Sequence, residues 1–209
     1  MTSIDELIQR YPLLAACRAD IESAFRALVD CYAAGGKVLV CGNGGSAADA
    51  DHIVGELMKG FLRKRPLPPE MRVSLAAADP ELGGEIAAKL QGALPAINLS
   101  AASAFTTAFG NDVSAHLTYA QAVIGYGRQG DALVGLSTSG NATNVLAAFC
   151  VARGLGLKTI GMTGSKGGRM VGRCDILIKV PAESTPKVQE LHLPIYHCLC
   201  AMIEAHFFP

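Results

Sequence analysis

Two short segments of the chain concentrate side chains that could do chemistry. The first is GNGGSAADADHIVGE, from Gly42 to Glu56, and the second is LSTSGNATN, from Leu136 to Asn144. Each follows an apolar run that reads as a buried strand. In the first, a glycine turn leads into a helix beginning near Ser46, where exposed backbone amides and the helix dipole favour an anion. The alternative is that Ser46 only caps a helix after a tight turn.

The second segment carries three hydroxyl groups directly after its strand, on Ser137, Thr138 and Ser139. Packing requires none of them at this position. Hydroxyls and backbone amides at a helix N-terminus can surround the oxygens of a phosphate group. A hydroxyl cap on the following helix is the alternative. Because this segment, like the first, places polar groups between a buried strand and a helix N-terminus, we expect it to bind phosphate.

Histidine and glutamate recur at a spacing that suits metal binding. His52 and Glu56 are four residues apart, which places them on one face of a helix. That spacing can present two ligands to one divalent metal ion, although a lone pair of this kind is common on solvated helix faces. Near the C-terminus, QELHLPIYH adds Gln189, His192 and His197 to an otherwise apolar helix. Of these, His192 could equally be an interior or surface histidine.

Alternating strands and helices must position these side chains. Apolar runs predict buried parallel strands, and periodic apolar residues predict helices between them, with Pro12 ending a short first helix. The predicted strands are 37–42, 96–100, 131–137, 157–162 and 174–180, and the predicted helices are 15–34, 46–60, 113–128, 141–154, 166–172 and 186–206. Segment 61–95 is less regular, and we expect its basic cluster, FLRKRPLPPEMR, to be a solvated connection and not a binding patch. A parallel α/β sheet binds ligands at the carboxyl ends of its strands, where both polar segments lie.

Composition narrows the class of protein. The chain has 209 residues, with 18 Lys plus Arg balanced by 18 Asp plus Glu. We therefore expect one globular domain with no nucleic-acid partner, and no apolar run is long enough to cross a membrane. The seven cysteines include no C-x-x-C pair, which predicts a reduced, cytoplasmic protein. Cys41, Cys150 and Cys198 lie among apolar residues and are predicted to be buried.

Taken together, the motifs resemble those of a known family. They are GNGGSAADADH-x-x-x-E, FGND at 109–112, STSGN at 137–141 and Q-E-x-H-x-x-x-x-H ending at His197. This combination resembles the sugar isomerase (SIS) domain family and, within it, the phosphoheptose isomerases, which act on sedoheptulose 7-phosphate. The resemblance implies a three-layer α/β/α sandwich with a five-stranded parallel sheet. It also implies a single SIS domain over residues 1–209, with an N-terminal helical extension (1–34), and a homotetramer with active sites between subunits.

The resemblance also implies roles for individual residues. Glu56 and His197 match the family's catalytic pair, and His52, Glu56, Gln189 and His197 match its Zn²⁺ ligands. The implied substrate-binding residues are Asn43, Gly44, Gly45, Ser46, Glu56, Asn111, Asp112, Ser137, Thr138, Ser139 and Gln189. The expected reaction converts sedoheptulose 7-phosphate to D-glycero-D-manno-heptose 7-phosphate, the first step of nucleotide-activated heptose synthesis.

The chain departs from the family pattern at three places. A serine common after S-T-S-G-N is Ala142 here, so a phosphate hydroxyl is missing unless Thr143 replaces it. MKGF follows the H-x-x-x-E motif where a polar residue such as arginine is often found, and segment 61–95 is longer than in the shortest members.

The spacing of two implied ligands raises a geometric question. Gln189 and His197 are eight residues apart, about 12 Å along a regular helix. Either Pro194 kinks the helix between them, or one ligand comes from a neighbouring subunit. The family's assembly favours the shared site.

Two other functions compete with the isomerase. A related non-catalytic SIS protein binds the bacterial replication initiator and also carries CLC and a final FP near its C-terminus, but it lacks the second histidine of the pair. A sugar-phosphate sensor could keep the phosphate loops without turnover. Because this chain keeps His52, Glu56, Gln189 and His197 together, the sequence favours the enzyme.

Overall fold

A five-stranded sheet organises the molecule, and all of its strand pairs are parallel. The computed structural model describes residues 2–209. The strands are β1 (Val38–Cys41), β2 (Ala96–Asn98), β3 (Ala132–Leu136), β4 (Lys158–Thr163) and β5 (Ile176–Lys179). All five predicted strands are confirmed, in the order β2-β1-β3-β4-β5.

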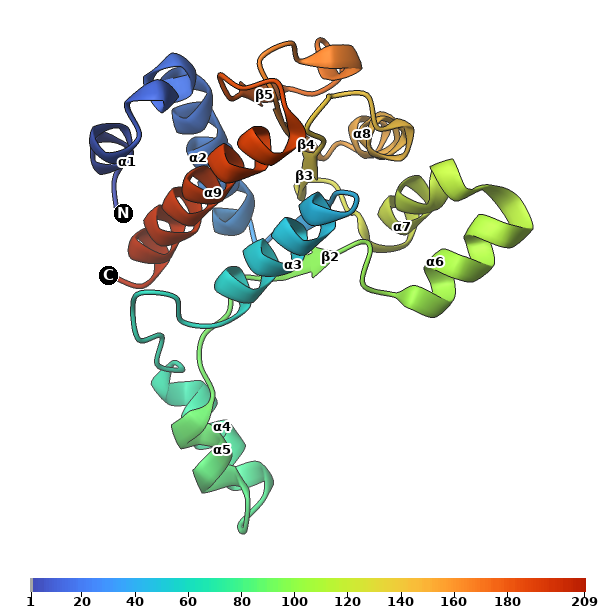
Figure 1. The fold of residues 1–209 in the computed structure, drawn as a ribbon. Helices are drawn as coiled ribbons and strands as arrows, with labels where there is room; N and C mark the ends of the chain where they lie inside the picture. The colour runs from blue at the N-terminus through green and yellow to red at the C-terminus, as the bar shows by residue number, and fades with distance from the viewer. Residues whose placement is uncertain (1) are drawn as a thin grey trace.

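Helices cover both faces of this sheet, so the expected three-layer α/β/α sandwich is confirmed (Figure 1). One face packs against α1 (Ile4–Arg10), α2 (Arg18–Ala33), α3 (Gly45–Met58) and α9 (Thr185–Phe207). The other packs against α7 (Thr118–Tyr126) and α8 (Thr143–Gly154). Because successive strand residues point to opposite faces, Val38 and Val40 join the first core and Leu39 and Cys41 the second.

Some predicted helices differ in detail from the structure. The 3₁₀ helix η1 (Pro12–Cys17) separates α1 from α2, as Pro12 suggested. The predicted helix 113–128 is divided: a π-helical turn, η2 (Gly110–Ser114), and a 3₁₀ turn, η3 (Ala115–Leu117), precede α7. The predicted helix 166–172 is wrong. Only the short 3₁₀ helix η4 (Gly168–Met170) forms there, because Gly167, Gly168 and Gly172 all adopt positive φ.

Segment 61–95 contains an unpredicted helical hairpin, α4 (Pro69–Ala78) and α5 (Gly83–Lys89), which extends away from the sandwich (Figure 1). Helix α4 buries none of its residues. Its pattern therefore gave no apolar stripe to detect. After β2, the helix α6 (Ser103–Phe109) and η2 form a second projection on another side of the molecule (Figure 1).

The base of the hairpin is fastened by an ion pair inside the protein. Both side chains of the Arg65–Glu204 pair are fully buried, with Arg65 Nε 2.8 Å from Glu204 Oε1. Arg65 also donates to the backbone oxygens of Glu56 and Leu57, at 2.9 and 2.6 Å. The basic cluster is therefore not wholly a solvated connection: Arg63 and Lys64 are exposed, but Arg65 is part of the core.

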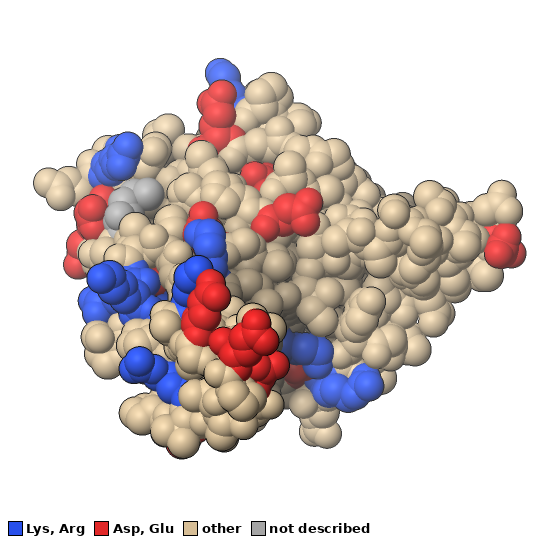
Figure 2. Space-filling model, turned by 90° about the horizontal axis from the view of Figure 1, so that it is seen from below, with Lys and Arg blue, Asp and Glu red and all other residues tan. Residues whose placement is uncertain are grey.

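The charged surface is mixed on the side from which the hairpin projects. Figure 2 shows Lys and Arg side chains interspersed with Asp and Glu on this face, without a continuous field of one sign. Within residues 2–209, no helix is both long and apolar enough to cross a membrane.

Candidate active site

The order of the strands creates a crevice beside β1 and β3. Chain connections leave these neighbouring strands in opposite directions across the sheet, and such a switch point is where parallel sheets bind ligands. The two polar loops that follow β1 and β3 are joined by paired hydrogen bonds between Asn43 and Asn144. Each side-chain amide donates to the other's oxygen, at 2.9 and 2.8 Å. The structure thus brings the two predicted phosphate loops side by side.

The first loop turns sharply through glycine. Gly44 adopts φ +56°, which side chains other than glycine rarely tolerate, and α3 begins directly after it. Gly45 packs against α9, because a β-carbon there would lie 2.4 Å from Gln189 Nε2. Ser46 is buried beneath the turn, whereas Asn43, Gly44 and Gly45 are exposed and available to a ligand.

The second loop is held by its own hydroxyl groups. Ser137 Oγ accepts a hydrogen bond from the backbone of Ala142 at 3.4 Å, and Ser139 Oγ accepts one from Asn141 at 3.2 Å. Thr138 Oγ1 lies 3.4 Å from Thr185 Oγ1. Each serine hydroxyl in these bonds acts as acceptor and keeps its own proton to donate; Ser139 is exposed, whereas Ser137 is buried.

The serine hydroxyl that Ala142 lacks is not replaced by another hydroxyl at the same position. Ala142 is the residue before α8, and no side chain caps that helix. Thr143, the next residue, is exposed at the first position of the helix.

Three of the predicted catalytic and metal-binding side chains converge between α3 and α9. His52 Nε2 lies 3.2 Å from Glu56 Oε1 and 3.2 Å from His197 Nε2. Glu56 also contacts Lys59 Nζ at 3.0 Å. Burial, followed by the nearby His52, lowers the pKa of His197, although Glu56 opposes this shift. His197 is therefore neutral at neutral pH and can accept a proton.

Gln189 lies elsewhere on α9. The helix continues through Pro194 without interruption, so Gln189 is about two turns from His197 and contacts Gly45. Pro194 therefore does not break the helix to bring Gln189 and His197 together. Among the described residues, no hydrogen bond joins Gln189 to His52, Glu56 or His197.

Asn111 and Asp112 are also apart from this cluster. They lie in η2, on the α6 projection, where both are exposed. Among the described residues, their side chains hydrogen-bond to each other, from Asn111 Nδ2 to Asp112 Oδ1 at 2.9 Å. Within the described part of one chain, they reach none of the other predicted site residues.

Sequence reasoning missed two tyrosines and their partners. Tyr196 is buried, and its hydroxyl lies 3.1 Å from Asp49 Oδ1 and 3.2 Å from His52 Nδ1. Tyr119 is also buried and donates a short hydrogen bond to the Gly42 oxygen, beside the glycine turn. The sequence signals for this group were a tyrosine next to His197 and an aspartate three residues before His52.

The types of side chain in the cluster and the distances from His52 to Glu56 and His197 suit a zinc ion, but the three side chains do not form a complete coordination site. Zinc bound at about 2.0–2.1 Å in a tetrahedron has neighbouring ligands roughly 3.3 Å apart, close to both 3.2 Å separations at His52. As their side chains are placed, however, the described His, Cys, Asp and Glu residues include no group of three that could hold a metal ion. Closure needs a side-chain shift or a further ligand.

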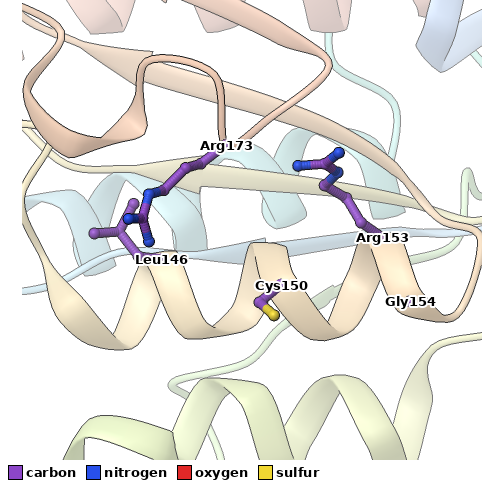
Figure 3. A pocket seen from close by; sticks show the side chains of 5 residues that line it. All are labelled: Leu146, Cys150, Arg153, Gly154 and Arg173. Carbon is purple, nitrogen blue, oxygen red and sulfur yellow. The ribbon is translucent and has the colours of Figure 1, made fainter.

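A cavity of about 450 Å³ elsewhere contains none of the predicted site residues. It lies along α8 and is lined by Leu146, Cys150, Arg153, Gly154 and Arg173 (Figure 3). Cys150 is exposed there, so its predicted burial is wrong, whereas Cys41 and Cys198 are buried as expected. Position 150 falls on the outer side of α8, which an apolar neighbourhood in sequence does not reveal.

The fold and its two loops match a known class of protein. The family model described as the SIS domain matches residues 7–86 and 79–164. Among curated relatives, the phosphoheptose isomerase of Desulfovibrio desulfuricans is 41% identical over 187 residues, covering 90% of this chain and 76% of the relative. That of Rhodospirillum rubrum is 38% identical, covering 91% and 88%.

Solved structures agree with these relatives. A phosphoheptose isomerase from Neisseria gonorrhoeae has a TM-score of 0.75 and 30% identity, covering 97% of this chain and 95% of that one. One from Francisella tularensis has a TM-score of 0.74 and 31% identity, covering 98% and 100%. The chain belongs to the phosphoheptose isomerase family of SIS domain proteins.

Proposed function

We propose that this protein converts sedoheptulose 7-phosphate to D-glycero-D-manno-heptose 7-phosphate, the first step of nucleotide-activated heptose synthesis. Family membership supports the reaction class and the sugar-phosphate substrate. The observation that carries the proposal is the convergence of Glu56, His52 and His197, since a sugar-phosphate sensor has no need of a base and a proton carrier.

The reaction moves a proton between C1 and C2 of the sugar through an enediol. Glu56 would take the carbon-bound proton and return it to the neighbouring carbon. His197, neutral at neutral pH because burial lowers its pKa, would carry a proton between the two oxygens. The hydroxyls and amides of residues 137–139 would anchor the phosphate and so position the reacting end of the sugar.

We propose Zn²⁺ as the cofactor, held by His52, Glu56 and His197, with Gln189 as a further ligand. When bound, the ion would polarise the carbonyl and stabilise negative charge on the sugar oxygens. A carboxylate bound to zinc is a poorer base and a zinc-bound imidazole nitrogen accepts no proton, so Glu56 and His197 would transfer protons only through atoms that are not bound to the ion.

Assembly would complete the site. We propose a homotetramer in which residues of a neighbouring subunit, Gln189, Asn111 and Asp112 among them, join the His52 cluster. The position of all three away from this cluster in one chain supports a shared site. The hairpin also exposes apolar side chains available to a neighbour, namely Met71, Val73, Leu82, Ile86 and Leu90. The cysteine pattern continues to favour a cytoplasmic location.

Replacing the proposed base tests this mechanism. We expect Glu56→Gln to remove nearly all turnover of sedoheptulose 7-phosphate, because an amide cannot accept the carbon-bound proton. The variant should still bind the sugar phosphate, measured by calorimetry, since the phosphate loops are unchanged. Substantial remaining activity would reject Glu56 as the base.

A further inference from the structure

A buried polar chain lies behind the proposed ligand cluster. The Tyr196 hydroxyl lies 3.1 Å from Asp49 Oδ1 on one side and 3.2 Å from His52 Nδ1 on the other. Tyr196 is only 2% exposed, so water does not compete for its hydroxyl. His52 therefore has its Nδ1 nitrogen engaged inside the protein, while its Nε2 nitrogen faces Glu56 and His197.

The direction of these hydrogen bonds follows from counting protons. A tyrosine hydroxyl has one proton to donate and lone pairs to accept with. The other oxygen of Asp49, Oδ2, is buried without a partner among the described residues. Tyr196 is thus the hydrogen-bond donor available to this carboxylate, and donation to a charged acceptor is the stronger choice. The hydroxyl's lone pair then faces His52 Nδ1 at 3.2 Å, where an N–H would donate to it and a bare ring nitrogen would repel it.

We propose that Asp49 and Tyr196 are positioning residues that hold the proton of His52 on Nδ1, so that Nε2 is the atom available to a metal ion. Buried partners that fix the tautomer of a histidine commonly raise the basicity of the nitrogen that binds the metal. This inference rests on the proposed metal-binding role of His52, but the tautomer itself can be measured without turnover.

Two matched variants separate this role from simple packing. The Tyr196 ring packs against the rings of His52 and His197, with centroids 5.5 and 5.0 Å away. Tyr196→Phe keeps the ring and removes only the hydroxyl. Tyr32→Phe makes the same change at another buried tyrosine, whose hydroxyl bonds to the Pro95 backbone oxygen at 3.3 Å. Asp49→Asn provides a second break in the chain.

The test is ¹⁵N NMR of the histidine rings in metal-free protein, with His52→Gln used to assign the His52 signals. We expect a protonated Nδ1 on His52 in the wild-type and Tyr32→Phe proteins, and a mixture of tautomers in Tyr196→Phe. Zn²⁺ affinity, measured by competition with a chromophoric chelator, should fall about 10- to 100-fold in Tyr196→Phe and Asp49→Asn. It should be unchanged in Tyr32→Phe.

A wild-type His52 with its proton on Nε2 alone would overturn the proposal. So would an unchanged tautomer and zinc affinity in folded Tyr196→Phe. A protonated Nδ1 in a protein without isomerase activity would contradict the proposed function and leave this inference standing, so the two failures are distinguishable.

Discussion

The absence of a side chain at Gly45 matters for the candidate site and not for the stability of the fold. A β-carbon there would lie 2.4 Å from Gln189 Nε2. The amide of glutamine is the end of a flexible side chain, so it can move away at little cost in stability. In moving, it would leave the position it holds beside the glycine turn.

Gly45→Ala should therefore damage activity without damaging the fold. We expect kcat/KM to fall on the order of 10- to 100-fold, because displacing a positioned group by about 1 Å can have that effect. The unfolding temperature should change little. Gly84→Ala is the control, since nothing lies within 4 Å of a β-carbon at that position. Equal kcat/KM for both variants and wild type would show that Gln189 does not act here.

His192 gives the protein a specific sensitivity to acid. Its ring is fully buried, and burial lowers its pKa from 6.5 to about 4, with the Thr163 backbone partly opposing the shift. Between pH 4 and pH 6.5, His192 is largely protonated in the unfolded chain and largely neutral in the folded chain. Stability should thus decrease as pH falls through this window, by about 2 kcal/mol between pH 7 and pH 5 from this residue.

Urea unfolding of the wild-type protein and His192→Gln at pH 7 and pH 5 measures this contribution. The variant should lose less stability on acidification than the wild type, by about that amount. Parallel losses in the two proteins would place the acid sensitivity elsewhere.

Elements that bury an apolar run were predictable, and elements that bury few or no apolar side chains were not. The five strands stand out because each is an apolar run enclosed by helices on both faces. Helix α4 buries nothing, so its sequence carries no periodic signal. The role of Arg65 was also hidden, since no local pattern shows which of several neighbouring cations will meet a carboxylate 139 residues away.

The Arg65–Glu204 pair should be a major stabiliser of the joint between α3, α9 and the hairpin. Glu204 also accepts hydrogen bonds from the backbones of Phe61 and Leu62, each at 2.7 Å. Burial alone would raise the pKa of Glu204, but these bonds and Arg65 hold it below its usual value. Glu204→Ala leaves Arg65 charged and buried, and we expect a loss of about 3–5 kcal/mol.

Chemical denaturation checks this value against an exposed pair. Glu85→Ala breaks the exposed ion pair with Lys89 and should cost no more than about 0.5 kcal/mol. A similar small loss for Glu204→Ala would mean that water enters to replace the lost carboxylate.

The candidate site is only partly contained in one chain. Spacing placed His52 and Glu56 on one helix face and the family resemblance added His197, and the structure brings the three together because α3 and α9 pack side by side. Gln189, Asn111 and Asp112 were implied by resemblance, and one chain holds them apart. Sequence spacing cannot show which ligands a second copy supplies.

Mixing inactive variants tests the shared site. If Gln189 of one subunit completes the site of another, refolding Gln189→Ala with Glu56→Gln should restore about a quarter of wild-type activity, since random pairing makes that fraction of sites intact. Glu56→Gln mixed with His197→Ala should stay inactive, because those residues belong to one chain. No recovery in the first mixture would confine the site to a single subunit.

¹H NMR of sedoheptulose 7-phosphate incubated with the zinc-loaded protein, with and without a chelator, tests the proposed isomerase activity most directly. We expect steady conversion to the aldose heptose 7-phosphate, loss of turnover on chelation, and recovery when zinc is restored. No conversion by folded, zinc-loaded protein would contradict the proposed activity and favour a non-catalytic SIS protein or a sugar-phosphate sensor.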